Sequence, residues 1–138
     1  MIDVNEVRNV VEGSSDYNKH KYQPWDFWIK FKINNGFDCD LIKRILRSKA
    51  TDPRILDYKK IKHICLERIR QFNENENVFS IENLEPKDIT LSEMLEDYDI
   101  TKEDVLMITR ILYPKSNNRV EDYECVIELC DKRIKELE

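Results

Sequence analysis

Two stretches of this sequence repeat each other, and the repeat limits the possible folds more than any other feature. Residues 37–46 (FDCDLIKRIL) match residues 103–112 (EDVLMITRIL) at five of ten positions. Residues 57–69 match residues 122–134 at five of thirteen positions, after the loss of one residue in the loop between. Any two amphipathic helices share some pattern, but identities that keep their order indicate a duplication. A unit that cannot bury its own apolar face packs against its copy.

Signals for helix starts occur throughout the chain, whereas signals for strands are nearly absent. Pro24 suits the first turn of a short aromatic helix, Asp38 can cap the next helix, and Asp52-Pro53 can start a long one. Capping boxes are formed by Asp3 with Glu6, Thr90 with Glu93, Thr101 with Asp104, and Asn118 with Glu121. We therefore expect an all-α fold: a tandem duplication of a three-helix unit, packed as a compact helical bundle, plus an N-terminal helix.

The predicted boundaries separate regions of opposite charge. They are an N-terminal helix at 1–15, a basic three-helix unit at 16–72, a linker at 73–89, and an acidic, degenerate copy of the unit at 90–138. Residues 16–72 contain 14 Lys/Arg and 7 Asp/Glu, net +7, whereas residues 73–138 contain 8 and 18, net −10. An anionic ligand is therefore expected to bind the first unit.

Composition excludes several classes of protein. The chain has two glycines, too few for the glycine-rich loops that wrap phosphates. Its four cysteines show no CxxC spacing, so we expect free, buried thiols and no structural zinc. No apolar run is long enough to cross a bilayer and no signal peptide is evident, which predicts a cytoplasmic protein without a membrane partner. A net charge of −5 and the lack of a recognition motif argue against nucleic-acid binding.

Basic side chains on two consecutive predicted helices are the candidate phosphate-binding residues. They are Lys43, Arg44, Arg47, Lys59, Lys60 and His63. Two adjacent positive faces could clamp a phosphate, with Arg supplying a bidentate fork, or could form a solvated basic surface. The second copy has Thr109, Tyr113 and Cys125 where the first has Lys43, Arg47 and Lys60, so the core positions persist while these cations do not.

Aromatic and acidic clusters each allow two interpretations. Trp25 and Trp28 either join the core or form a platform on which a base stacks beside the cations. The acidic stripe Glu121, Glu124, Glu128 and Asp131 resembles metal-binding pairs of helical nucleotide pyrophosphatases, but it runs along one helix, where a solvated face belongs. Asp38, Asp40 and Asp57 could serve as metal ligands or a general base, or equally as helix caps. No metal site and no catalytic residue is predicted.

Five short motifs of the first unit stand out together: YQPWDF at 22–27, GF at 36–37, LIKRILR at 41–47, LDYKKI at 56–61 and ERI at 67–69. With these motifs the unit resembles a family of small helical phage proteins. The family includes a nucleotide kinase acting on deoxynucleoside monophosphates, while most of its members have no assigned function. The resemblance, which covers about residues 18–72, implies a phage origin, with the host cytoplasm as location, and a role in nucleotide handling. Magnesium would be needed only if the protein is a nucleotide enzyme.

Two functions remain open at this point. The first is binding of a nucleotide or another phosphate-bearing ligand through the basic face. The second is a non-enzymatic phage effector that inhibits a host protein or sequesters a signalling nucleotide. The opposite charges of the two units also predict self-association into a homo-oligomer.

Overall fold

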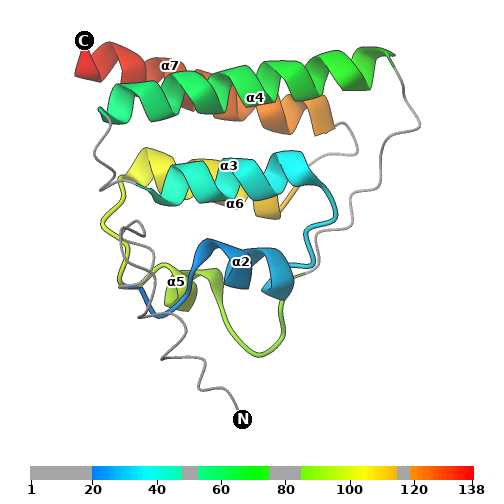
Figure 1. Ribbon diagram of the computed structural model, residues 1–138, viewed down its shortest axis with the longest axis vertical. Helices are drawn as coiled ribbons and strands as arrows, with labels where there is room; N and C mark the ends of the chain where they lie inside the picture. Colours follow the sequence, from blue (N-terminus) through cyan, green and yellow to red (C-terminus); the bar gives the residue numbers. More distant parts are fainter. Residues whose placement is uncertain (1–19, 48–52, 75–84, 115–118) are drawn as a thin grey trace, which may run out of the picture.

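The computed structural model describes residues 20–47, 53–74, 85–114 and 119–138, and the regular elements in these ranges are all helices. They are α2 (Pro24–Lys30), α3 (Gly36–Leu46), α4 (Arg54–Glu74), α5 (Leu91–Met94), α6 (Lys102–Leu112) and α7 (Arg119–Leu137) (Figure 1). The expected all-α class is confirmed. The predicted N-terminal helix at 1–15 lies outside the described residues. Of the predicted linker at 73–89, residues 73–74 end α4 and 75–84 lie outside.

The helices form three layers, and each half of the chain contributes one helix to each layer (Figure 1). The long helices α4 and α7 lie side by side and run in opposite directions. Beneath them α3 and α6 form a second antiparallel pair, and α2 and α5 lie at the far end. The helices α3 and α6 both have 11 residues and occupy the same layer, whereas α2 has 7 residues and α5 has 4.

The start of α3 differs from the sequence prediction. Asn35, not Asp38, is the N-cap: its side-chain oxygen accepts a hydrogen bond from the Asp38 backbone N–H at 2.8 Å. Gly36 is the first helical residue. Asp38 thus occupies the third helical position, and its carboxylate is buried rather than capping. Because Asn35 caps the helix, the Asp38 side chain is left for other partners.

Of the capping boxes predicted for the second half, that of Thr101 with Asp104 is confirmed, and Thr90 is confirmed as an N-cap. Thr101 and Asp104 form a reciprocal capping box at the start of α6. The Thr90 hydroxyl accepts a hydrogen bond from the Glu93 N–H at the start of α5. Asn118, predicted to cap α7, lies outside the described residues. At the starts of α5 and α6, the residues that cap the helix are therefore the ones that the sequence predicts.

A single core joins the two halves. Its fully buried side chains come from both, among them Phe27, Leu41, Ile42, Tyr58, Ile61, Met94, Met107, Ile108, Tyr123 and Val126. All four cysteines are free thiols; Cys65 and Cys130 are buried, and Cys39 and Cys125 are half-buried. Within the described residues, no helix has the length and apolar character needed to span a membrane.

Candidate functional site

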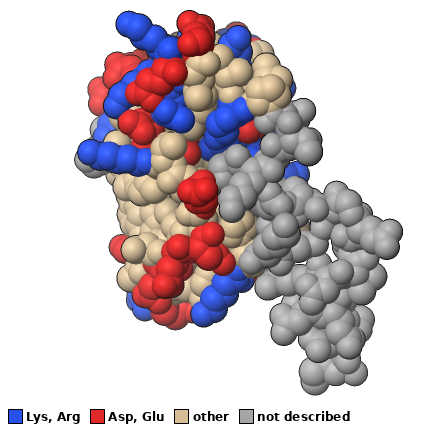
Figure 2. All heavy atoms as spheres, turned by 90° about the vertical axis from the view of Figure 1, so that its left-hand side faces the viewer, with Lys and Arg blue, Asp and Glu red and all other residues tan. Residues whose placement is uncertain are grey.

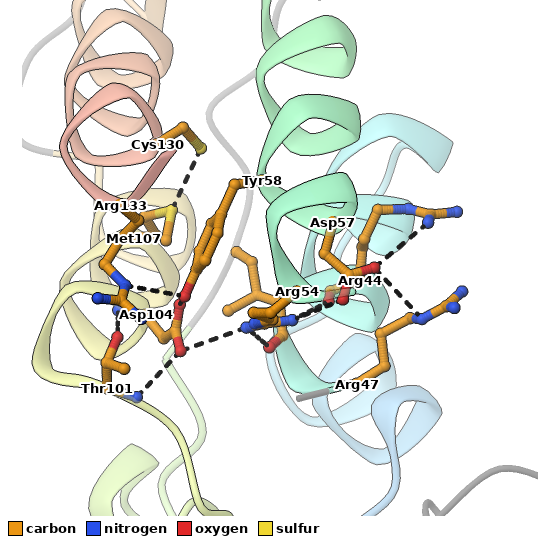
Figure 3. Close-up of polar contacts among 11 residues, drawn as sticks. Arg44, Arg47, Arg54, Asp57, Tyr58, Thr101, Asp104, Met107, Cys130 and Arg133 are labelled. Carbon is orange, nitrogen blue, oxygen red and sulfur yellow. Dashed lines mark hydrogen bonds and ion pairs between the residues drawn. The ribbon is translucent and has the colours of Figure 1, made fainter. Parts of the chain in front are cut away.

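An arginine at the start of α4 connects the two halves through a buried polar network (Figure 3). The Arg54 guanidinium donates hydrogen bonds to the backbone carbonyls of Arg44 and Ile45, at 3.1 and 2.6 Å, at the end of α3. It also pairs with Asp57 on its own helix and with Asp104 on α6, both at 3.2 Å. One side chain therefore satisfies the C-terminal carbonyls of α3 and two buried carboxylates.

A tyrosine completes this network. Tyr58 donates its hydroxyl hydrogen to Asp104 at 2.7 Å and accepts a hydrogen bond from Arg133 at 3.3 Å (Figure 3). Burial raises the pKa of Tyr58 above its ordinary value, so the phenol stays protonated and remains a donor. Because Asp104 also accepts from the Thr101 backbone N–H, its carboxylate has partners on α4 and α6.

The same network is found again in the second half. Arg119 donates to the carbonyls of Arg110 and Ile111, at 3.3 and 2.8 Å, and pairs with Asp122 and Asp38 at 3.2 and 2.9 Å. The Tyr123 hydroxyl then donates to Asp38 at 2.6 Å, the same contact that Tyr58 makes with Asp104. Burial raises the pKa of Tyr123 as well. Each half thus lends one buried aspartate to the arginine and tyrosine of the other.

Asp38 and Asp57 are therefore framework residues. Both are buried, with side-chain exposures of 1 and 2%, and both accept hydrogen bonds or ion pairs from arginine. Removing a partner from such a buried ion pair is strongly destabilising, which suits a structural role. Of the three carboxylates that the sequence left open, only Asp40 is exposed.

The halves differ in the cations around these frameworks. Asp57 is approached by Arg44 at 3.7 Å and by Arg47 at 3.5 Å, in addition to Arg54. In the second half, Asp122 is paired with Arg110 at 2.8 Å and with Arg119. The position equivalent to Arg47 is Tyr113, whose ring packs edge-on against Phe31 instead. Arg44 thus has a structural counterpart, whereas Arg47 is an additional cation specific to the first half.

A cleft lies between the start of α3 and the middle of α4. It has a volume of about 360 Å³ and is lined by Gly36, Phe37, Asp40, Lys60, His63, Ile64 and Glu67. Two predicted phosphate-binding residues, Lys60 and His63, therefore share one cavity. Its wall also carries two carboxylates and an aromatic ring, which the sequence did not place there.

The remaining predicted site residues lie outside the cleft lining. Lys43 on α3 and Lys59 on α4 are exposed, and Lys59 is not part of the cleft lining. Arg44 and Arg47 point toward Asp57 (Figure 3). The structure therefore divides the six predicted cations into two at Asp57, two in the cleft and two elsewhere on the α3 and α4 surfaces.

The equivalent place in the second half has a different surface. Where the cleft has Asp40, Lys60 and Ile64, the second half has Leu106, Cys125 and Leu129. Phe37 and Glu67 correspond to Glu103 and Lys132, which form an ion pair at 2.9 Å. His63 corresponds to Glu128, and Gly36 corresponds to Lys102, so this place in the second half is also charged. It differs from the cleft in having no cation at the positions of Lys60 and His63.

The two tryptophans do not share one environment. Trp28 packs against the core, as expected for a helical aromatic residue, whereas Trp25 is 46% exposed on α2. Neither belongs to the lining of the α3–α4 cleft, where Phe37 is the aromatic residue. In the sequence, Phe37 belongs to the same aromatic cluster as the tryptophans, for which a core position and a stacking platform were both open.

The acidic stripe of α7 is a solvated face. Glu121, Glu124, Glu128 and Asp131 are all exposed, and Asp131 pairs with Lys62 on α4 at 2.7 Å. Within the described part of the chain, no group of three or more His, Cys, Asp or Glu side chains is placed to hold a metal ion.

Arg54 and Arg119 are central to the two networks, although neither was among the site residues predicted from the sequence. Both lie three positions before the Asp-Tyr pairs that the repeat aligned, so extending the match from 57 and 122 to 54 and 119 adds another identity. A signal was therefore present. The repeat also carries Arg68 and Arg133, and Arg133 reaches Tyr58 of the other half.

Comparisons with known proteins add no relative to this geometry. No family model matches the chain, and neither does a curated protein or a solved structure. The function must therefore be argued from the residues of the chain itself.

Proposed function

We propose that the chain is a tandem duplication in which the first copy binds a nucleotide or a similar phosphate-bearing ligand and the second copy is a structural partner. The matched networks around Arg54 and Arg119 support the duplication, because equivalent residues make equivalent contacts with the opposite half. Residues that make the same contacts in both copies serve the fold, whereas residues that occur in one copy alone can serve another purpose.

Lys43, Arg47 and Lys60 are the cations that remain once the shared framework is subtracted. Their counterparts are Thr109, Tyr113 and Cys125, so folding of this unit does not require a cation at these positions. Side chains of exposed cations lose entropy when they are ordered, and an anionic ligand can offset that loss through charge-assisted hydrogen bonds. The single observation that carries the proposal is that one of these added cations, Lys60, lines a cleft together with His63.

The lining of the cleft also describes the rest of the ligand. Lys60 and His63 suit a phosphate, whereas Asp40 and Glu67 accept hydrogen bonds from amino or hydroxyl groups. Phe37 supplies an apolar contact for a ring. A volume of about 360 Å³ falls at the small end of the range for small-molecule sites. A ligand that combines a phosphate with donor groups on a ring, as a nucleotide does, fits this mixture better than inorganic phosphate.

The resemblance of residues 18–72 to the phage family points to the same class of ligand. That family includes a nucleotide kinase, and the motif at 41–47 contains Lys43 and Arg47 while the motif at 56–61 contains Lys60. A phage origin and a place in nucleotide handling are therefore part of the proposal.

A thermal-shift screen tests this function. The purified protein is heated with each ribo- and deoxynucleoside mono-, di- and triphosphate, with and without magnesium. A ligand at 100 times its Kd stabilises the folded state by about 2.7 kcal/mol. We expect one group of nucleotides to raise the Tm, and Lys60→Ala and the double variant Lys43→Ala/Arg47→Ala to lose that response.

Matched controls separate binding from folding. Asp122 is held by two arginines in the second half, so Asp57 should stay paired with Arg44 and Arg54 when Arg47 is removed. Lys135→Ala, an exposed lysine on α7, should respond to nucleotides like the wild type. The proposal fails if no nucleotide shifts the wild-type Tm, or if the Lys60 and Lys43/Arg47 variants respond as the wild type does.

A further inference from the structure

The outermost layer of the molecule presents two helix faces of opposite charge. The face of α4 that points away from the core carries Leu56, Lys59, His63, Leu66 and Arg70, and all five are exposed. At the equivalent positions α7 carries Glu121, Glu124, Glu128, Asp131 and Lys135, also exposed. The α4 face is thus basic with two leucines, and the α7 face is acidic with one lysine.

These two faces are neighbours. Lys62 of α4 and Asp131 of α7 form an ion pair across the layer, and the helices run antiparallel (Figure 1). At the end of the molecule where α4 begins and α7 ends, blue and red side chains lie close together over this layer (Figure 2). A surface that holds a basic strip beside an acidic strip is complementary to itself after a half-turn.

We propose that this α4–α7 layer is the interface of a homodimer, with α4 of one copy on α7 of the other. A two-fold axis that runs parallel to the helices, just outside the layer, exchanges the two strips. The axis leaves each helix direction unchanged, so α4 lies antiparallel to the partner's α7. The four helices then form an up-down-up-down bundle, a common packing arrangement.

The symmetry makes the contact closed. Both copies use the same patch, so a basic strip meets an acidic strip twice and no strip is left for a third copy. The Lys62–Asp131 ion pair shows which residues of α4 and α7 lie at the same height along the two helix axes. The proposed two-fold axis keeps this height, so His63 lies at nearly the same height as Asp131 of the other copy. About two turns away, Arg70 lies opposite Glu124 of the other copy, because the two helices run antiparallel.

Apolar and charged groups both contribute to this surface. Leu56 and Leu66 are 51% and 49% exposed on α4, and docking would remove them from water. Within the described residues, Lys59, Glu124 and Glu128 form no ion pair, so they are available to a partner. Opposite charges at a contact of this kind set its specificity and its sensitivity to salt.

Charge reversal tests the arrangement directly. One variant, Lys59→Glu/Arg70→Glu, makes both strips acidic; the other, Glu124→Lys/Glu128→Lys, makes both basic. The mass of each is measured by light scattering after gel filtration and by sedimentation, with helix content checked by circular dichroism. We expect the wild type at twice the chain mass of 16.7 kDa, with dissociation as salt rises, and each variant alone at 16.7 kDa.

The decisive sample is the equimolar mixture of the two variants. In the proposed dimer, the acidic α4 of one variant meets the basic α7 of the other, and the basic α4 of the second meets the acidic α7 of the first. The mixture should therefore recover the dimer mass although neither variant forms it alone. The control Lys32→Glu/Lys87→Glu makes the same charge change on exposed residues outside the α4–α7 layer and should stay dimeric.

Three results would overturn the interface. They are a wild-type protein that stays monomeric up to about 1 mM, where even weak complexes form, variants that remain dimeric on their own, and a mixture that stays monomeric. None of these outcomes depends on nucleotide binding, because Lys43, Arg47 and Lys60 are unchanged in every variant.

Discussion

Arg119 shows how much structure can depend on a single buried side chain. It is 5% exposed, and its guanidinium binds two carbonyls at the end of α6 and two carboxylates from different halves of the chain. Taking a charge out of water is costly, and only a complete set of partners offsets that cost. Removing one member of such a set leaves the remaining charges buried with fewer partners.

Replacing Arg119 with methionine should therefore destabilise the protein strongly. Arg119→Met keeps much of the apolar volume but removes the ion pairs with the buried Asp38 and Asp122, and breaking a buried ion pair in this way costs about 3–5 kcal/mol. Chemical denaturation, followed by circular dichroism, gives the free energy of unfolding. Lys132→Met is the control: Lys132 is exposed on α7, outside the acidic strip, where it pairs with Glu103, and such surface pairs contribute about 0–1 kcal/mol. Similar losses for both variants would contradict the role assigned to Arg119.

At the scale of the helix, the N-terminal cap is the feature that the local sequence determines most clearly in this chain. The α6 capping box satisfies two backbone N–H groups through the Thr101 hydroxyl and the Asp104 carboxylate. Asp104 also holds Tyr58 and Arg54, so the cap of α6 and the contact between halves share one carboxylate. A change at the cap is therefore felt beyond the helix.

Two threonines of α6 give a matched test of this cap. Thr101→Ala removes the N-cap oxygen and should cost about 1 kcal/mol. The Thr109 hydroxyl instead bonds the Val105 carbonyl of its own helix at 2.7 Å, and alanine favours a helix interior, so Thr109→Ala should change stability by a few tenths of a kcal/mol at most, in either direction. Urea unfolding of both variants measures the difference. Equal effects would show that the cap is not what fixes the start of α6.

These elements also show which features the sequence can predict. Thr90, Thr101 and Pro24 mark helix starts by local chemistry, and the structure follows them. Asp38 was predicted as a cap because caps and first-turn acids are the same residue types, and only the long-range contact with Arg119 and Tyr123 distinguishes the two. Similarly, the inward orientation of Arg44 toward Asp57 depends on how α3 packs on α4, which helix periodicity does not encode.

The candidate site was predictable to a similar degree. Lys60 and His63 were identified by their type and spacing on one helix, and both line the cleft. The sequence did not predict that Asp40, Glu67 and Phe37 lie beside these cations, because that proximity arises from the packing of α3 against α4. Comparison of the halves would have identified Arg54 with Arg119, since the identity lies just outside the aligned stretch.

At the scale of the whole molecule, each half supplies hydrogen-bond and ion-pair partners to buried side chains of the other half. Asp104 of the second half accepts from Arg54 and Tyr58 of the first, and Asp38 of the first accepts from Arg119 and Tyr123 of the second. The apolar core is also continuous between them. Neither half can unfold without leaving buried carboxylates, arginines and apolar surface of the other exposed or unpaired.

The protein should therefore unfold in one transition, and its tryptophans provide a probe for this. Both tryptophans, Trp25 and Trp28, lie on α2 in the first half, so their fluorescence reports that half, whereas circular dichroism reports all helices. Ile108 is fully buried in the second half, and Ile108→Ala should cost about 2–5 kcal/mol. At a fixed protein concentration, this variant should lower the midpoint by the same amount with both probes.

Ile42→Ala, at the equivalent position of the first half, is the matched control and should do the same. A fluorescence midpoint that stays at the wild-type value in Ile108→Ala, while the circular dichroism midpoint falls, would mean that the first half folds independently and that the shared networks do not couple the two.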